Sequence, residues 1–239
     1  MTWLRLDDAK LEAPRGVGMM IAALYVQPKG CYANLPDVDP WPESRDARTY
    51  AGPWPVVAHP PCARWSKLAG QVEHRYGIRR GDDGGCFALA LDAVREWGGV
   101  LEHPEGSAAW RAHGLLAPPR AGGWVAAGDG IGWTCCVDQG HYGHAAGKAT
   151  WLYAAKVHSL PSLIWGRHAR PRAGLTARQV RTGICQRLSK NQRAATPIPF
   201  RDLLLSIARY GGAHHPANMR VLCLTCNSRK SGLIDKRGA

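Results

Sequence analysis

The stretch VVAHPPCARWSKLAG, residues 56–70, begins with an apolar run that stops abruptly at two prolines. Three consecutive apolar residues are typical of a strand that is buried on both faces. Pro60 and Pro61 cannot donate to a sheet, so they end the strand and hold Cys62 on a rigid turn. A lone cysteine after a strand is more often a small buried hydrophobic residue. Held this rigidly, however, it is also suited to attack a carbon from one direction.

A second apolar run ends in polar residues in the same way. The stretch GVLEHPEG, residues 99–106, predicts a short strand that runs into Glu102 and His103. Between the two runs, residues 83–97 predict a helix, because apolar residues recur on one face at helical spacing. In α/β sheets, ligands and chemistry lie just past the carboxyl ends of the strands. We therefore expect Cys62 and Glu102 to meet at one edge of a sheet.

The remaining elements complete an α/β order. Residues 19–26 predict another buried strand, and a long irregular crossover follows, with a short element near residues 45–50. Further expected elements are a helix capped by Ser107 (107–116), two strands (132–144 and 148–156) and an amphipathic helix (200–212). We expect an N-terminal arm (1–18), one α/β catalytic domain (19–210) and a cysteine-containing tail (211–239).

Charge points to a polyanionic partner. The 239 residues carry a formal net charge of +13, and such a balance favours nucleic acid. The basic residues concentrate in residues 156–199, which we expect to contact DNA through Arg181, Arg187, Lys190 and Arg193. The start of the chain shows no signal peptide, and its first apolar run is too short to span a membrane. We therefore expect a cytoplasmic protein whose eight cysteines are reduced thiols or metal ligands.

Three segments carry a resemblance to the cytosine-5 DNA methyltransferases. HPPCARWS (59–66) is similar to their proline–cysteine motif, in which the cysteine is the nucleophile. GGVLEHPEG (98–106) resembles the motif that follows, with Glu102 at the family's glutamate. YGHAAGKATWLYA (142–154) resembles their Gly-x-x-Gln-x-Arg-x-Arg stretch through Gly143 and Lys148. The resemblance covers roughly residues 55–155, and the chain is also similar to compact phage-encoded predicted DNA methylases.

The resemblance implies a Rossmann-like, methyltransferase-type sheet and a covalent mechanism in a bacterial or phage-infected cell. Cys62 would attack C6 of a cytosine, Glu102 would act at N3, and Lys148 would help at the base or a phosphate. S-adenosylmethionine would be the methyl donor. The residues expected to contact this cofactor are Gly30, Asp46 and Pro60.

Reaching a base in double-stranded DNA would require flipping it out of the helix. Arg64 is a candidate contact to the DNA, and Trp65 or Trp151 could stack on the base. Arg64 or Lys67 could also lower the pKa of the Cys62 thiol.

The chain departs from the family in two places. The strand MMIAALYV and the QPKG that follows it (19–30) lack the family's glycine cluster, and only residues 156–199 stand where a large target-recognition region is expected. Two alternatives therefore remain open: a non-catalytic DNA-binding protein on a decayed methylase fold, and action on a free nucleotide or with another donor.

The tail is different in kind. GGAHHPANMRVLCLTCNSRKSG (211–232) resembles the second half of an HNH endonuclease module, but Leu203 and Leu204 stand where its Asp-His would lie. A DNA endonuclease is therefore a further alternative. Cys-x-x-Cys is half a zinc site, which predicts a candidate zinc knuckle gripping phosphate. Its expected ligands and phosphate contact are Cys223, Cys226, His214, His215 and Arg229.

A second candidate ligand cluster joins Cys135 and Cys136 to His141 and His144. Adjacent residues on a strand point to opposite faces, so we expect these two cysteines to be structural.

Overall fold

A computed structural model describes residues 20–209 apart from 67–68, 78, 174–179 and 183–184. The predicted N-terminal arm and the cysteine tail lie outside these ranges. The expected zinc ligands and phosphate contact of the tail are therefore outside the described residues as well: Cys223, Cys226, His214, His215 and Arg229.

A seven-stranded sheet forms the centre of the protein, in the order β2-β1-β3-β4-β7-β6-β5. The first four strands are mutually parallel, β7 is antiparallel to both of its neighbours, and β5 is antiparallel to β6. The strands are β1 (Ile21–Leu24), β2 (Val38–Trp41), β3 (Val56–Ala58), β4 (Gly99–Pro104), β5 (Val125–Ala126), β6 (Gly132–Asp138) and β7 (Ala149–Ala155). The expected α/β class is confirmed.

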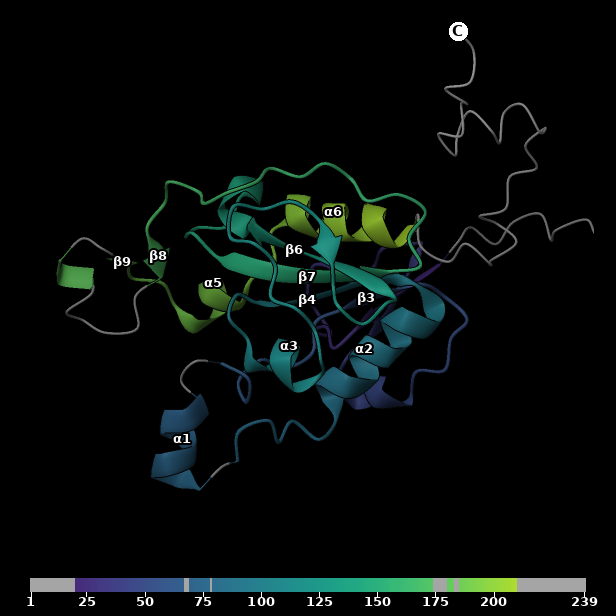
Figure 1. Cartoon of the computed structure of the whole chain (residues 1–239), viewed down its shortest axis with the longest axis horizontal. Coiled ribbons are helices and arrows are strands. Elements are labelled where there is room, and N and C mark those ends of the chain that lie inside the picture. Colours follow the sequence, from purple (N-terminus) through teal and green to yellow (C-terminus); the bar gives the residue numbers. More distant parts are fainter. Residues whose placement is uncertain (1–19, 67–68, 78, 174–179, 183–184, 210–239) are drawn as a thin grey trace, which may run out of the picture.

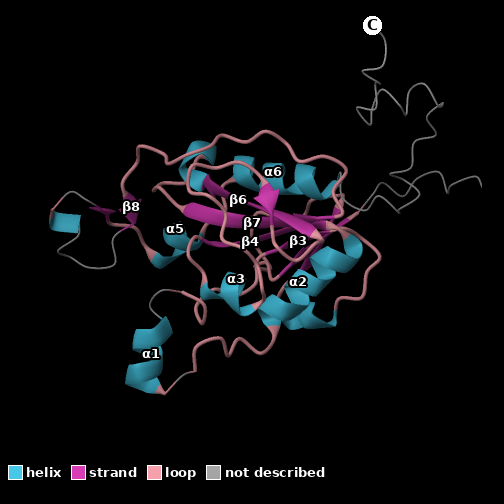
Figure 2. Cartoon of the chain, viewed as in Figure 1, coloured by secondary structure: helices cyan, strands magenta, loops and turns pink. Residues whose placement is uncertain are grey.

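Helices cover both faces of the sheet (Figure 1, Figure 2). On one face lie α2 (Cys86–Trp97) and α3 (Ala108–Ala112), and on the other lies α6 (Ile198–Arg209). The predicted apolar stripes of α2 and α6 are the faces they bury against the sheet. The described chain also holds α1 (Ala69–Tyr76), α5 (Lys190–Ala194), three short 3-10 helices, η1 (Glu43–Arg45), η2 (Ala47–Thr49) and η3 (Gln139–Tyr142), and a two-stranded sheet of β8 (Arg172–Ala173) and β9 (Cys185–Gln186).

The structure corrects the sequence-based expectation at two elements. Strand β2 lies within the predicted irregular crossover, where Val-Asp-Pro-Trp buries only Val38 and so lacks an apolar run. Proline is tolerated there because β2 is an edge strand. The strand expected over residues 132–144 ends at Asp138, whose carboxylate accepts from the N–H of Gly140 and starts η3.

Adjacent Cys135 and Cys136 on β6 belong to opposite core layers. Cys136 packs in the layer that holds α2 and α3, and Cys135 packs in the layer that holds α6. Burial raises the pKa of both thiols. The expected structural role of the pair is confirmed.

No helix in the described part of the chain is both long and apolar enough to cross a membrane.

Candidate active site

A pocket opens where the order of the sheet reverses. The chain passes from β1 to β2 on one side, whereas β3 pairs with the other side of β1, so the loops that leave β1 and β3 diverge. Such a crevice at the carboxyl ends of strands is the usual binding site of an open α/β sheet. The pocket has a volume of about 650 Å³ and is lined by residues that follow β1 and β3, by the last three residues of β4, by Lys148, and by residues 191 and 193–196 in and after α5.

The structure brings Cys62, Glu102 and Lys148 together in this pocket. Strands β3 and β4 pair in parallel with Ala58 opposite Leu101, so His59, just past the end of β3, lies level with Glu102, which is still within β4 and pairs with Leu152 of β7. Cys62 follows after the two prolines. Lys148 arrives from the turn before β7, the antiparallel neighbour of β4. The folded sheet thus brings together residues that lie far apart in the sequence: Cys62 and Lys148 are separated by 86 positions.

Cys62 is a thiol in the free protein. Burial raises its pKa above the ordinary 9.0, the negative charge of Glu102 raises it further, and the charge of Lys148 opposes the rise. The sequence predicted that Arg64 or Lys67 would lower this pKa. That prediction is wrong in its direction, and the cation beside the thiol is Lys148; Lys67 lies outside the described residues.

Glu102 is held as a carboxylate. Its Oε2 lies 3.0 Å from Nδ1 of His59, and its Oε1 accepts from the amide of Gln139 at 3.1 Å. Burial by itself would raise the pKa, but the hydrogen bond to His59 and the charge of Lys148 outweigh it and bring the pKa from 4.5 down to about 2. The carboxylate is therefore ionised throughout the physiological range.

Sequence reasoning assigned no role in this site to three of its residues: Tyr32, His59 and Gln139. The hydroxyl of Tyr32 lies 2.9 Å from Nε2 of His59, and the Gln139 amide also donates to Thr150 at 2.9 Å. His59 and Gln139 each directly follow a strand, β3 and β6, so the strand-end rule could have found them. Tyr32 stands in an irregular segment, where no pattern in the sequence marks it.

His103 supports the site from behind. Its ring is buried among Phe87 and Trp110, and its Nδ1 lies 2.7 Å from the Ser107 hydroxyl. Burial lowers its pKa from 6.5 to about 4, and the charge of Glu102 opposes this only in part. His103 is thus a neutral packing residue at neutral pH, although it also lines the pocket.

Two of the three expected cofactor contacts line the pocket. Gly30 and Pro60 do so. Asp46 does not: its carboxylate accepts hydrogen bonds from Nε and a terminal nitrogen of Arg48 at 2.7 and 2.8 Å, and it caps η2. The hydrogen bond from Arg48 lowers the pKa of Asp46. Asp46 was expected to contact the cofactor, but in the structure its carboxylate pairs with Arg48 and caps η2.

The expected DNA contacts divide into three groups. Trp65 is 8 % exposed, its indole N–H donates to Asp83 at 2.7 Å, and its ring packs against Phe87, so it is a core residue rather than a stacking platform. Trp151 is 9 % exposed and lies in the same core cluster. Arg193 lines the pocket, whereas Arg64 does not and is half-buried in the chain segment that follows Cys62. The remaining three are exposed: Arg181, Arg187 and Lys190.

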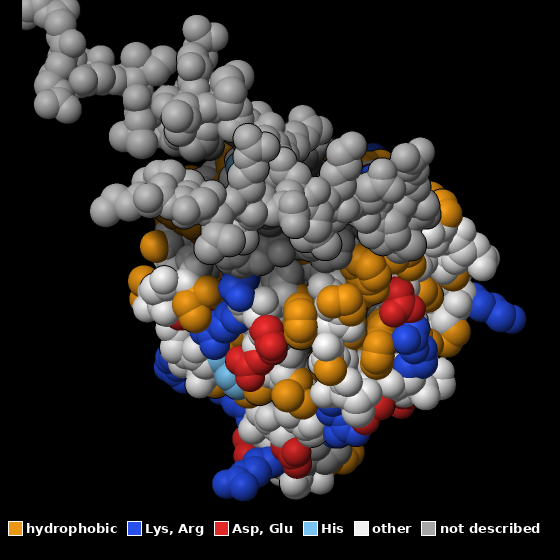
Figure 3. Space-filling model, turned by 90° about the vertical axis from the view of Figure 1, so that its right-hand side faces the viewer, with side chains coloured by type: hydrophobic (Ala, Val, Ile, Leu, Met, Phe, Trp, Pro, Cys, Tyr) orange, Lys and Arg blue, Asp and Glu red, His pale blue; other side chains and the backbone are white. Residues whose placement is uncertain are grey.

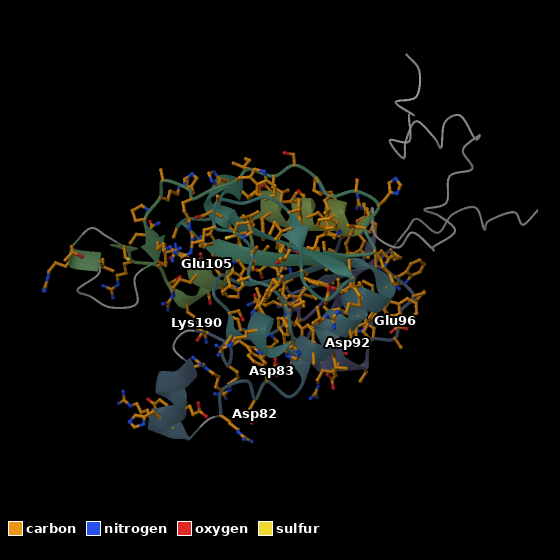
Figure 4. The ribbon with its side chains drawn as sticks, viewed as in Figure 1. Asp82, Asp83, Asp92, Glu96, Glu105 and Lys190 are labelled. Atoms are coloured by element: carbon orange, nitrogen blue, oxygen red, sulfur yellow. The ribbon has the colours of Figure 1, made fainter. Side chains whose placement is uncertain are left out.

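Charge is distributed unevenly over the described residues. Figure 4 places Lys190 and Glu105 at one end of the molecule and the α2 acids Asp92 and Glu96 at the other. Glu105 pairs with Arg172 at 3.1 Å and with Arg167 and Arg120, which ties part of the basic region to the end of β4. On the face drawn in Figure 3, by contrast, cations are interspersed with acids and apolar side chains. We therefore expect polyanions to approach the end that carries the pocket.

The described residues contain no cluster of three or more His, Cys, Asp or Glu side chains that could hold a metal ion. Comparison of the chain with protein-family models, curated proteins and solved structures finds no match in any of the three.

Proposed function

We propose that the protein modifies a pyrimidine base of DNA at C5 through a covalent adduct at C6, most simply as a cytosine-5 methyltransferase-like enzyme. The observation that carries the proposal is the convergence of Cys62, Glu102 and Lys148 in one pocket at the reversal point of the sheet, where the charge of Lys148 lowers the pKa of both other groups.

The chemistry needs a nucleophile and a partner for the ring nitrogen. The Cys62 thiolate adds to C6, the electron pair of the C5–C6 double bond moves through the ring, and N3 takes up a proton on the side of Glu102. C5 then becomes a carbon nucleophile that accepts a one-carbon group. After loss of the C5 proton, the sulfur leaves and the ring regains its double bond. Lys148 stabilises both the thiolate and the carboxylate.

The pocket fits a methyl donor such as S-adenosylmethionine in part. Tyr25 lines the pocket, and its buried hydroxyl has no hydrogen-bond partner among the described residues. At Gly30 a Cβ would lie 3.1 Å from the carbonyl oxygen of Gln27, so this turn of the wall is tight. Tyr25, Gly30 and Pro60 are the residues that would hold the donor, which would supply an electrophilic methyl group. A Rossmann-like, methyltransferase-type sheet is the finer fold proposal that goes with this role.

DNA is the partner that the charge of the chain supports. Arg193 lines the pocket and Lys190 begins the helix beside it, so a strand of DNA could lie along α5 while its flipped base enters the pocket.

The test is adduct formation with an oligonucleotide that contains 5-fluorocytosine, in the presence of S-adenosylmethionine. Once C5 has accepted the methyl group, fluorine cannot leave as a cation, so the sulfur is not expelled and the adduct is trapped. We expect the wild-type protein and Cys31→Ala to form a complex that survives denaturation, and Cys62→Ala to form none. Cys31 is the matched control because it is the second thiol that lines the pocket. An undiminished adduct with Cys62→Ala would sink the assignment of the nucleophile.

A second candidate function is a non-catalytic DNA-binding protein. The raised pKa of Cys62 and the fully engaged Glu102 favour it. Calorimetry with S-adenosylmethionine separates the two, because only an enzyme that uses this donor needs to bind it. Analysis of nucleosides in DNA from cells that express the protein, with Cys62→Ala alongside, covers any other donor.

A further inference from the structure

Tyr32, His59 and Glu102 form a continuous hydrogen-bonded chain along the wall of the pocket. The Tyr32 hydroxyl contacts Nε2 of His59 at 2.9 Å, and Nδ1 of the same ring contacts Oε2 of Glu102 at 3.0 Å. All three residues line the pocket. They come from three separate segments, after β1, after β3 and in β4, so only the folded sheet assembles the chain.

The chain can hold one proton more or one proton fewer without losing a hydrogen bond. A carboxylate only accepts, so Nδ1 of His59 carries a proton whether the ring is neutral or charged. A phenol can donate or accept. Tyr32 therefore donates to Nε2 of a neutral ring and accepts from Nε2 of a charged one. Burial raises the pKa of Tyr32 well above its usual range, which keeps the hydroxyl protonated.

Glu102 by itself has no proton to give. Both of its oxygens already accept hydrogen bonds, from His59 and from Gln139. The addition of sulfur to C6 nevertheless requires a proton at N3. The proton on Nδ1 of His59 is already hydrogen-bonded to Oε2 of Glu102. It is therefore the proton that can most directly reach the carboxylate.

We propose that His59, held by Tyr32, is the proton store of the site and supplies through Glu102 the proton that N3 takes up. The inference rests on the proposed function and assigns a positioning role that the cysteine and the glutamate alone do not fill. As the Cys62 sulfur adds to C6, the Nδ1 proton of charged His59 passes to Oε2 of Glu102 and the Glu102 proton passes to N3. Unlike the resting states, this step leaves a neutral His59 with its remaining proton on Nε2, donated to Tyr32, and without the hydrogen bond from Nδ1 to Glu102 until the proton returns. When the sulfur leaves, the N3 proton returns by the same route.

The charged and titratable groups around His59 are few. Tyr32 and Glu102 contact it directly, and Cys62, Lys148 and Arg193 line the same pocket from the segments after β3, before β7 and in α5. Cys31 and His103 line it as well, and His103 is neutral because of its lowered pKa. Lysine and arginine keep their charge near neutrality. His59 and the nucleophilic thiol are therefore the two groups whose ionisation sets the pH dependence.

The two groups must be in opposite states for the reaction, which makes the pH profile diagnostic. His59 must carry the proton that it gives, whereas Cys62 must have lost its own. Without His59 only the thiolate requirement remains, so the rate of adduct formation should rise with pH more steeply than it does in wild type.

The experiment is single-turnover adduct formation with the 5-fluorocytosine oligonucleotide across a range of pH, alongside anisotropy to measure DNA binding. We expect His59→Gln to bind DNA as wild type does, to form adduct at least about 100-fold more slowly at pH 7, and to show a steeper rise of rate with pH than wild type. Tyr32→Phe should lower the rate without changing the slope of the pH profile, because charged His59 loses its acceptor. Tyr50→Phe, which removes a hydroxyl bonded to Trp54 outside the pocket, should change nothing.

A wild-type rate and a wild-type pH profile in His59→Gln would overturn the proton store while leaving the proposed function intact. Absence of adduct in the wild-type protein at every pH would overturn the proposed function and this role with it. Nitrogen-15 chemical shifts of His59 give a readout that needs no activity: Nδ1 protonated at every pH supports the chain, and a bare Nδ1 at neutral pH overturns it.

Discussion

Cys62 and the charges beside it define the site at the scale of single residues. Its thiol lines the pocket with Glu102 and Lys148, one of which disfavours the thiolate while the other favours it. The nucleophile is therefore stored in its protonated, unreactive form until a substrate changes the balance. Desolvation and the two opposite charges make this a property of the assembled site and not of the Pro-Pro-Cys sequence.

The ionisation of Cys62 can be measured in the free protein. Because burial and Glu102 raise the pKa of this thiol, we expect iodoacetamide to label Cys62 more slowly than a small free thiol at pH 8. The labelling rate should still be climbing above pH 9, since only the thiolate reacts.

Two variants test the cause by mass spectrometry of the Cys62 peptide. Glu102→Gln should accelerate labelling at pH 8 and Lys148→Met should slow it, because they remove charges of opposite sign. Equal labelling rates in wild type and both variants would contradict the electrostatic explanation.

At the scale of elements, the close pairing of β3 with β4 is what brings the two strand ends together. Gly99 begins β4 opposite Val56 with a φ of +120°, and a Cβ on it would lie 2.0 Å from the carbonyl oxygen of Val56. No side chain fits there. A glycine that reads in the sequence as the end of a helix is thus also what allows β4 to approach β3.

Gly99→Ala tests this close approach. The variant meets both a strained backbone conformation and a contact with fixed backbone atoms, so we expect a loss of about 2–5 kcal/mol in the free energy of unfolding, measured in urea. Gly130→Ala is the matched control: its φ is also positive, +73°, but a Cβ there would meet nothing within 4 Å. It should cost about 1–2 kcal/mol. Equal losses in the two variants would show that the backbone conformation alone matters.

Elements with a strong apolar pattern were predictable, and those without one were not. The stripe of α6, with buried Phe200, Leu204 and Ile207, is visible in the sequence, and α6 begins two residues before its predicted start. Strand β2 and the loop that carries Tyr32 have no such pattern, because an edge strand needs little burial and the loop is shaped by its contacts.

At the scale of the whole molecule, the net charge of +13 favours a polyanionic partner, and the position of the charged residues relative to the pocket bears on how that partner would approach. Arg193 and Lys190 stand at the pocket end, whereas Asp92 and Glu96 stand on α2 at the opposite end (Figure 4). In the function proposed above, these cations would favour DNA that lies with a flipped base at the pocket.

Salt dependence measures this orientation. We expect the logarithm of the DNA association constant to fall linearly with the logarithm of salt concentration, with a slope of about −0.9 for each phosphate contacted. Arg193→Ala should reduce the magnitude of the slope by about one. Arg209→Ala, which removes a cation that is paired with Asp37 at the end of α6, should leave it unchanged. Identical slopes for all three proteins would place the DNA elsewhere.

By itself, the sequence determined the α/β class, the strands that end in Cys62 and Glu102, and the helices α2 and α6, because apolar periodicity and proline stops act locally along the chain. Only the tertiary structure decided what those strand ends become. In the structure Glu102 is hydrogen-bonded to both His59 and Gln139, and Tyr32 contacts His59. Asp46 and Trp65, which were predicted to belong to the site, instead bond to Arg48 and Asp83. Hydrogen bonding and desolvation depend on which distant segments the sheet brings side by side, and no local pattern records that pairing.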